Sequence, residues 1–228
     1  MIDSGVYAAH PHVGEIAGGV AFDAEGREHG DFLDRLGHGT AVAAAIKEKA
    51  PDTDLYAVKI FERSLSTDIG TLIAAVDWAA ASAMHIANLS LGTARLEHAP
   101  ALRHAVDRAA AKNLIIVSAR DADGVEWLPG SLPGVIPVQL DWTCPRDDYR
   151  VAAVDGEIVF RASGFPRPIP GVEPARNLNG ISFAVANMTG FVARVMSELS
   201  DRSLPSIFEA LADNSTRRTQ RTQRAQRI

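Results

Sequence analysis

Three segments of the sequence place an Asp, a His and a Ser where each could take part in catalysis. Asp3 ends a short apolar strand, His38 lies between two glycines ahead of a small-residue helix, and Ser182 opens another small-residue helix. A serine hydroxyl is a weak nucleophile at neutral pH, so it needs an imidazole as general base, and a carboxylate must orient that imidazole. The three residue types together predict nucleophilic acyl transfer through Ser182.

Each segment also has a plain structural interpretation. Asp3 fits an ordinary turn after a strand, His38 fits a helix-capping loop, and Ser182 fits a simple N-cap, where serine is common. In the functional interpretation, the glycines beside His38 let a substrate backbone approach the imidazole. The start of a helix also favours a developing negative charge near Ser182. The chain order Asp, His, Ser is one of the known orders of such triads, so the set is more informative than any one segment.

The stretches between these residues alternate between short apolar runs and helix-like segments. We expect buried strands at residues 55–61, 84–91, 114–118 and 135–140, and helices at residues 68–82, 99–112, 182–199 and 206–212. Thr67 or Asp68 is the expected N-cap of the first of these helices. Short strands separated by helices of roughly 12–15 residues predict an α/β fold with a parallel sheet between helices. Functional groups gather beyond the carboxyl ends of the strands in such sheets.

The composition fits a soluble globular protein with a substantial core. The chain has 228 residues, of which 46% are hydrophobic and 22% are charged, so we expect one α/β domain or at most two small ones. Its apolar runs are far shorter than the ~20 residues that cross a bilayer, and Met1 stands just before the first motif. We therefore expect neither a membrane span nor a secretory leader. Cys144 is the single cysteine, which excludes an internal disulfide and makes cytoplasmic residence the simplest expectation.

Basic residues are concentrated at the C-terminal end of the chain. Residues 216–228 hold five arginines and no acid, whereas the formal net charge of the whole chain is −5. Few apolar residues and no periodicity predict a folded domain at residues 1–214 and a basic, disordered tail at residues 215–228. Such a tail can bind nucleic acid or an acidic surface, and a solvated end is the plainer alternative. The folded body lacks the basic and aromatic stripe of a nucleic-acid interface.

Further segments resemble the subtilisin-like serine proteases, the subtilase family. Residues 86–92 (Ile-Ala-Asn-Leu-Ser-Leu-Gly) are similar to the family's substrate-binding strand. Residues 128–138 are similar to the segment that follows the family's oxyanion loop, and residues 163–171 to the stretch before its catalytic serine. These matches are collinear with the Asp, His and Ser segments and extend over nearly the whole chain. The sequence therefore resembles a compact subtilase.

The resemblance implies a three-layer α/β/α subtilisin-like fold with a mainly parallel central sheet. It also implies endopeptidase chemistry through an acyl-enzyme, in which Asp3 orients His38 and His38 activates Ser182. The segment Ser90, Leu91 and Gly92 would then hold a peptide or protein substrate as an added β-strand. No cofactor is implied, and the sequence does not indicate an oligomeric state.

One departure concerns the oxyanion site. The family places an Asn there as a hydrogen-bond donor, whereas this sequence aligns Asp121 with that Asn and Arg120 with the Gly before it. An ionised Asp cannot donate, and loss of one such donor costs about 10²–10³ in rate in subtilisin itself. A protonated Asp121 could donate, as in a few related enzymes, or Arg120 could supply positive charge. Both alternatives stay open at this point.

The sequence departs from the family pattern at several other positions. Ile181 replaces a usual Thr, Ala186 replaces a usual Pro, and the loop at residues 121–129 is shorter than in the family. No cluster of acidic and Asn ligands suggests the family's calcium sites, so we expect no metal. His10 and His12 lie two residues apart without a third ligand, so we expect a surface loop there. The strand before Asp3 has only two residues, because the chain begins late or because this is a compact variant.

The leading interpretation is an active serine endopeptidase, and more specifically a dedicated enzyme that trims a leader from a modified peptide. The alternative is a pseudo-protease, catalytically weak or inactive, that binds peptide as a regulatory module. Asp121, Ile181 and the short N-terminal strand favour the alternative, whereas the complete set of Asp3, His38 and Ser182 favours catalysis. The reactivity of Ser182 separates the two.

Overall fold

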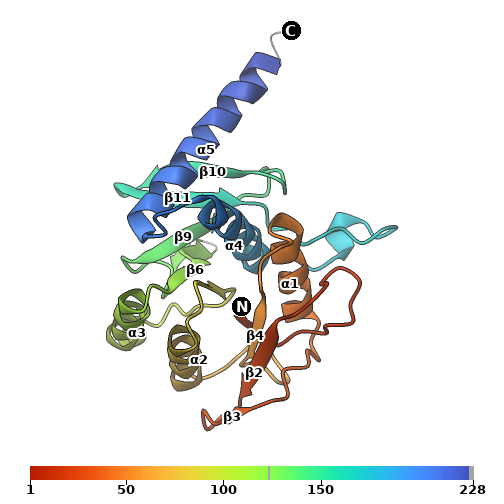
Figure 1. Ribbon diagram of the computed structural model, residues 1–228, viewed down its shortest axis with the longest axis vertical. Coiled ribbons are helices and arrows are strands. Elements are labelled where there is room, and N and C mark those ends of the chain that lie inside the picture. The colour runs from red at the N-terminus through yellow and green to blue at the C-terminus, as the bar shows by residue number, and fades with distance from the viewer. Residues whose placement is uncertain (123, 226–228) are drawn as a thin grey trace.

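The computed structural model is an α/β protein built on a central sheet (Figure 1). It describes residues 1–122 and 124–225, with the side chains of residues 122 and 216–225 excepted. The strands of the sheet are β1 (Ile2–Asp3), β2 (Gly18–Phe22), β3 (Glu28–His29), β4 (Tyr56–Lys59), β5 (Ile86–Leu89), β6 (Ile115–Ala119), β9 (Val135–Leu140), β10 (Tyr149–Val154) and β11 (Glu157–Ala162). They lie in the order β10-β11-β9-β6-β5-β1-β4-β2-β3.

The middle of the sheet is parallel. Strand β1 pairs in parallel with β4 and β5, and β6 pairs in parallel with β5 and β9. Antiparallel pairs occur only towards the edges of this described sheet, where β2 pairs with β3 and β10 with β11. After β6, the short strands β7 (Asp121–Ala122) and β8 (Val125–Glu126) form a separate hairpin. The predicted mainly parallel sheet is confirmed.

Helices cover both faces of the sheet. The helices are α1 (His38–Lys49), α2 (Ile69–Ala81), α3 (Ala99–Ala111), α4 (Ile181–Glu198) and α5 (Leu204–Ala225), with short 3₁₀ turns η1 (Leu96–His98) and η2 (Pro174–Arg176). Helices α2 and α3 share an apolar core with one face of the sheet, whereas α1, α4 and α5 pack on the other face. This arrangement confirms the three-layer α/β/α fold.

Every predicted strand and helix is present in the structure. Only the last helix differs from its prediction by more than two residues at either end, since α5 runs to Ala225. Asp68 is the N-cap of α2, and its side chain accepts a hydrogen bond from Thr71 N at 2.9 Å. Local capping chemistry therefore sets the start of α2 as the sequence predicts.

Helix α5 passes the β10–β11 hairpin and extends beyond the rest of the molecule (Figure 1). The backbone is helical to Ala225, but the side chains from residue 216 onward and the whole of residues 226–228 lie outside the described part of the chain. The predicted basic tail at residues 215–228, with its disorder and its partners, therefore stays a prediction. No helix in the described residues is both long enough and apolar enough to span a membrane.

Candidate active site

Asp3 stands in the middle of the parallel sheet, at the carboxyl end of β1. Side chains alternate between the two faces of a strand. Ile2 packs into the core shared with α2, so Asp3 points to the opposite face, which α1 covers. The residue is 0% exposed, and burial of a carboxylate is costly unless hydrogen bonds or charges compensate it. Its Oδ1 accepts from Ser4 N at 2.7 Å and contacts His38 at 2.8 Å.

His38 is the first residue of α1 and is 9% exposed. Its Nδ1 lies 2.8 Å from Asp3 Oδ1. This contact favours a proton on Nδ1 and leaves Nε2 as the acceptor that a general base needs. The preceding Gly37 caps the helix with a φ of 80°, a left-handed conformation that glycine adopts without strain.

Gly39 allows helix α1 to approach β1 closely. A Cβ at this position would lie 2.2 Å from the carbonyl oxygen of Gly5 and 3.2 Å from Asp3 Oδ1. The sequence analysis interpreted the glycines beside His38 as room for a substrate backbone. For Gly39 that interpretation is wrong, because its missing side chain makes room for the β1 turn. The glycine thereby holds His38 within reach of Asp3.

Asp34 organises the loop before α1, and the sequence analysis did not identify it. Its Oδ1 accepts from Ser4 Oγ, Leu36 N and Gly37 N, each at 2.9 Å. Its Oδ2 accepts from Thr40 N at 2.8 Å and from Thr40 Oγ1 at 2.6 Å. These bonds supply the helix cap that Gly37 cannot provide. An Asp shortly before a glycine-capped helix is the signal that could have identified it, because Asp side chains readily bond nearby backbone N–H groups.

Ser182 lies in the first turn of α4, after the N-cap Gly180. Its Oγ donates to the carbonyl oxygen of Ser90 at 3.1 Å, and Ser90 Oγ lies 3.0 Å from the carbonyl oxygen of Ser182. Within the described chain no hydrogen bond joins Ser182 to His38, but the ring of Phe183 packs on the His38 ring with 5.5 Å between centroids. Catalytic hydrogen bonds are often long in an empty site and tighten when substrate binds.

The environment raises the pKa of His38 above its usual value of 6.5. Burial acts in the opposite direction, since it disfavours the charged imidazolium. The hydrogen bond and the charge of Asp3, together with the charge of Asp34, outweigh that cost. The site therefore stabilises the imidazolium that forms when His38 takes a proton.

Asp121 lies at the start of β7, directly after β6. Its Oδ2 accepts from Gln139 Nε2 at 2.6 Å and lies 3.6 Å from Arg120 Nη1. Arg120 also pairs with Asp155 in the β10–β11 turn at 3.2 Å. In the described part of the chain no hydrogen bond or ion pair connects Asp121 with the Asp, His or Ser of the candidate triad. The oxyanion role of Asp121 or Arg120 stays a prediction.

The predicted substrate segment Ser90, Leu91 and Gly92 continues from the end of β5, beside Ser182. Among the described hydrogen bonds of the turns and loops, none uses the N–H groups of Leu91 or Gly92. These donors therefore remain available to an extended peptide. The next residue, Thr93, is already engaged, since it exchanges two backbone hydrogen bonds with Leu128.

The remaining sequence candidates lie outside this arrangement. The rings of His10 and His12 meet edge to face at 5.3 Å, and no group of three or more potential metal ligands occurs among the described residues. The expectation of no metal stays a prediction. Cys144 is buried at 3% exposure, and burial raises the pKa of its thiol to about 11, so it is a structural thiol.

Known proteins share both sequence and fold with this chain. The model of the subtilase family matches residues 1–126. Subtilisin DY of Bacillus licheniformis is 25% identical over 95% of this chain and 82% of its own length. A thermostable alkaline protease of Halalkalibacterium halodurans is 30% identical over 86% of this chain and 56% of its own length.

Solved structures agree in fold. A cold-adapted subtilisin-like serine proteinase superposes with a TM-score of 0.66 at 24% identity, over 89% of this chain and 75% of its own. A lanthipeptide protease superposes with a TM-score of 0.66 at 19% identity, over 86% of this chain and 72% of its own. At these identities the two structures support the fold alone, whereas the family model covers more than half of the sequence. The chain therefore belongs to the subtilase family of serine endopeptidases.

Proposed function

We propose that Asp3, His38 and Ser182 form the catalytic triad of an endopeptidase that cleaves peptide bonds through an acyl-enzyme. The observation that carries the proposal is the Asp3–His38 hydrogen bond of 2.8 Å at the carboxyl end of β1. The contact of Phe183, the residue after Ser182, with the imidazole supports a position of Ser182 near this pair. Asp3 is completely buried, which is the arrangement that orients an imidazole without releasing its proton to water.

In the acylation step, Ser182 Oγ attacks the carbonyl carbon of the scissile bond while its proton passes to His38 Nε2. The tetrahedral intermediate then collapses, the C–N bond breaks, and the leaving amine takes that proton from His38. A water molecule, deprotonated by His38, attacks the acyl ester and restores Ser182 with release of the acid. For the first step, Ser182 Oγ must turn from the carbonyl of Ser90, to which it donates a hydrogen bond.

The oxyanion of the intermediate would form at the start of α4. The N–H groups of a helix's first turn have no intrahelical acceptors, and the helix dipole favours negative charge there. We propose the N–H of Ser182 as one donor. Asp121 is the sequence-predicted residue for the second position, although its Oδ2 accepts a hydrogen bond from Gln139.

The free N–H groups of Leu91 and Gly92 support a substrate held as an extended strand. Main-chain hydrogen bonds of this kind give affinity with little dependence on sequence. The loop at residues 121–129 is short compared with the family pattern, and this reduction supports a dedicated processing enzyme that removes the leader of a modified peptide. The similarity in fold to a lanthipeptide protease is consistent with that proposal. Cytoplasmic action would suit a processing enzyme and is part of the same proposal.

A fluorophosphonate probe tests the triad, because it labels only an activated serine. Purified protein is treated with the probe and its intact mass is measured, beside Ser182→Ala and the exposed control Ser64→Ala. We expect one adduct on the wild type and on Ser64→Ala, and no adduct on Ser182→Ala. Absence of an adduct on the wild type between pH 4 and 9 would contradict the proposal and favour the peptide-binding module.

The processing role needs a separate comparison. Leader-bearing precursor peptides and unrelated peptides of matched length are offered at equal concentration, and cleavage is followed by mass spectrometry. A dedicated enzyme cleaves one junction in a precursor and leaves most of the panel intact. Equal cleavage of all peptides would exclude the processing role while leaving the endopeptidase activity in place.

A further inference from the structure

A cavity of about 460 Å³ lies directly beside the start of α1. One wall is made by the loop and first turns of α1, including Gly37 and Thr40, and the opposite wall by residues that precede Ser182, including Arg167 and Leu178. Tyr7, His10 and His12 also line it. The volume falls in the range of ligand-binding pockets in proteins.

The position of this cavity relates it to one half of the substrate. Because Nδ1 of His38 is hydrogen-bonded to Asp3, His38 must deliver its proton to the leaving amine from Nε2. The substrate residues that follow the scissile bond therefore begin next to the His38 imidazole. The strand of Ser90 contributes nothing to the lining of the cavity, so the half of the peptide paired with that strand lies elsewhere. The cavity does not include His38 or Ser182 in its lining, but it reaches Gly37, the neighbour of His38, and Leu178, four residues before Ser182, so it borders the side on which the leaving half departs.

The charged groups of the cavity differ in how far they are already paired. Its one carboxylate, Asp34, is already saturated by hydrogen bonds from Ser4, Leu36, Gly37 and Thr40. Arg35 is exposed and pairs outward with Asp31 and Glu62. Asp34 and Arg35 are therefore already engaged with other residues of the protein, which leaves Arg167 as the charged group of this cavity to consider.

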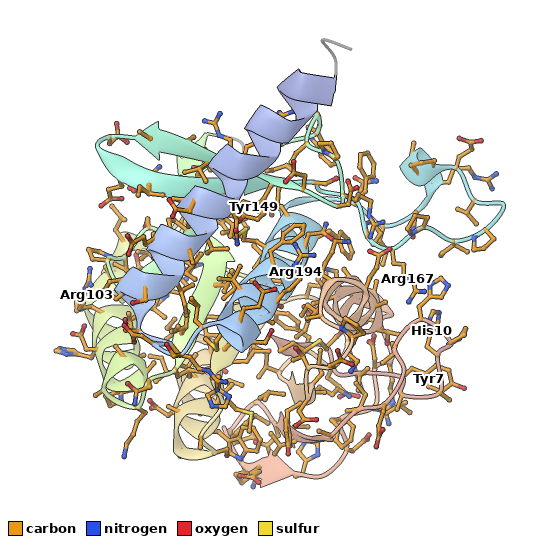
Figure 2. All side chains as sticks on the ribbon, turned by 45° about the horizontal axis from the view of Figure 1, so that its top comes forward. Tyr7, His10, Arg103, Tyr149, Arg167 and Arg194 are labelled. Atoms are coloured by element: carbon orange, nitrogen blue, oxygen red, sulfur yellow. The ribbon has the colours of Figure 1, made fainter. Side chains whose placement is uncertain are left out.

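Among the charged residues that line the cavity, Arg167 forms no ion pair with a described residue. It is half-buried and donates from Nη1 to the carbonyl oxygen of His12 at 3.0 Å. Across the described residues no carboxylate lies within ion-pair distance of it, although Glu15, Asp52 and Asp54 border an adjoining hollow. Figure 2 shows Arg167, His10 and Tyr7 on the same side of the molecule. A half-buried guanidinium with only a neutral acceptor retains donors for a bidentate carboxylate partner.

We propose that Arg167 selects substrates with a carboxylate in the leaving half of the peptide. The carboxylate would be an Asp or Glu side chain, or the C-terminal carboxylate of a peptide that ends within the cavity. This inference rests on the proposed endopeptidase function and deepens it by naming a substrate class. The mouth of the cavity supplies apolar contact for neighbouring side chains, since Tyr7, Ile169 and Leu178 are 51%, 42% and 46% exposed.

The substrate series starts from a peptide that the protein cleaves, found by mass spectrometry in a proteome-derived peptide mixture. It is resynthesised with an amidated C-terminus and with Glu, Gln or Lys at each of the first three positions after the scissile bond. Two further peptides end within these three positions, and they differ only in whether their C-terminus is free or amidated. The first series reports on a side chain, and the pair reports on the terminal carboxylate. The readout is kcat/KM, with KM and kcat separated.

Three substitutions at Arg167 accompany the series. Arg167→Gln removes the charge, Arg167→Glu reverses it, and Arg167→Lys keeps a cation. Arg103→Gln is the matched control, because Arg103 is also half-buried and donates to a backbone carbonyl, that of Pro133 at 2.8 Å. It lies on the opposite side of the molecule in Figure 2. Fluorophosphonate labelling of Ser182 shows whether each variant retains a folded site.

We expect the wild-type kcat/KM to be about tenfold higher for a carboxylate substrate than for its neutral partner, because one charge-assisted contact contributes about this much. The difference should arise mainly in KM. Arg167→Gln should abolish the preference, Arg167→Glu should turn it towards Lys, and Arg103→Gln should leave it intact. Equal rates for all peptides with the wild type would overturn the inference, even if an Arg167 variant failed to fold, while the endopeptidase proposal stood. Absence of both cleavage and labelling would overturn the two together.

Discussion

The two sides of Ser182 are stabilised in different ways. On the side of His38, the buried carboxylate of Asp3 and the carboxylate of Asp34 accept short hydrogen bonds from the strand end and the α1 loop. On the other side, Arg120 pairs with Asp155, a residue whose side chain is 82% exposed in a hairpin turn. A buried, hydrogen-bonded arrangement tolerates little change, whereas an ion pair with one strongly exposed partner is screened by water and contributes less.

The comparison indicates which parts of the site the chemistry constrains. Proton transfer needs His38 in one orientation, and the fold sets that orientation through the hydrogen bond to Asp3 and the ring contact with Phe183. The segment at residues 120–121 departs from the family pattern and contacts Gln139 and the hairpin instead of the triad. Substitutions on the first side should therefore be far more damaging than substitutions on the second.

Asp3→Asn should have the largest effect. The amide cannot hold the imidazole in the productive tautomer or stabilise its charged form, so we expect kcat to fall about 10⁴-fold with the fold intact. The measurement is kcat on a cleaved peptide, with circular dichroism as a check of folding. Asp155→Asn is the control from the opposite side and should change kcat little. A drop of less than tenfold in Asp3→Asn would show that the two sides do not differ as described.

Gly39→Ala should come next. The new methyl group would meet the carbonyl oxygen of Gly5 at 2.2 Å, so α1 must move away from Asp3. We expect a loss of about 1–3 kcal/mol in the free energy of unfolding and, because small misplacements are costly in catalysis, a loss of about 10² in kcat. Urea denaturation and peptide cleavage measure the two effects. Gly30→Ala, where a methyl group meets open space, should match the wild type.

The pH profile should sharpen the comparison further. The pKa of His38 is raised because the hydrogen bond and charge of Asp3 outweigh the effect of burial, so the acid limb of kcat/KM should have its midpoint above 6.5. Activity needs the neutral imidazole and falls as the pH decreases through the folded-state pKa. The contribution of this group to folding stability has the opposite trend, present below 6.5 and lost as the pH rises through the folded-state pKa. A midpoint at or below 6.5 would contradict the proposed Asp3 contact.

Asp121→Asn should have the smallest effect. Its carboxylate contacts Gln139 and Arg120, so we expect kcat to change by less than about tenfold, well below the 10²–10³ of an oxyanion donor. Peptide cleavage across pH 4 to 9 measures this. A change of 10² or more, or an acid optimum that the substitution moves towards neutral pH, would show that Asp121 works at the oxyanion.

Local signals predicted most of the fold. Residues 135–140 form β9 with the predicted bounds, and Asp68 caps α2 as expected, because periodicity and capping depend on neighbours in sequence. The sequence analysis did not identify β10 and β11. Their turn is Asp155-Gly156, with φ angles of 53° and 81°, and an Asp-Gly pair between apolar runs is a strong hairpin signal that was overlooked.

The residues of the site divide in the same way. Sequence pattern identified Asp3, His38 and Ser182, because their types and order carry chemical meaning without coordinates. It did not identify Asp34, whose five hydrogen bonds form only when the α1 loop folds back on Ser4. It also could not show that Gly39 serves the packing of α1 on β1, since Gly5 is remote in sequence.

The sequence by itself determined the family, the alternation of strands and helices, and the chemical type of the candidate triad. Each of these depends on residue identity, spacing or order along the chain. The tertiary structure alone decided that Asp3 and His38 touch, that Ser182 contacts Ser90, and that Arg167 has no acidic partner among the described residues. These facts join segments far apart in sequence, and only the packing of α1 and α4 on one face of the sheet brings them together.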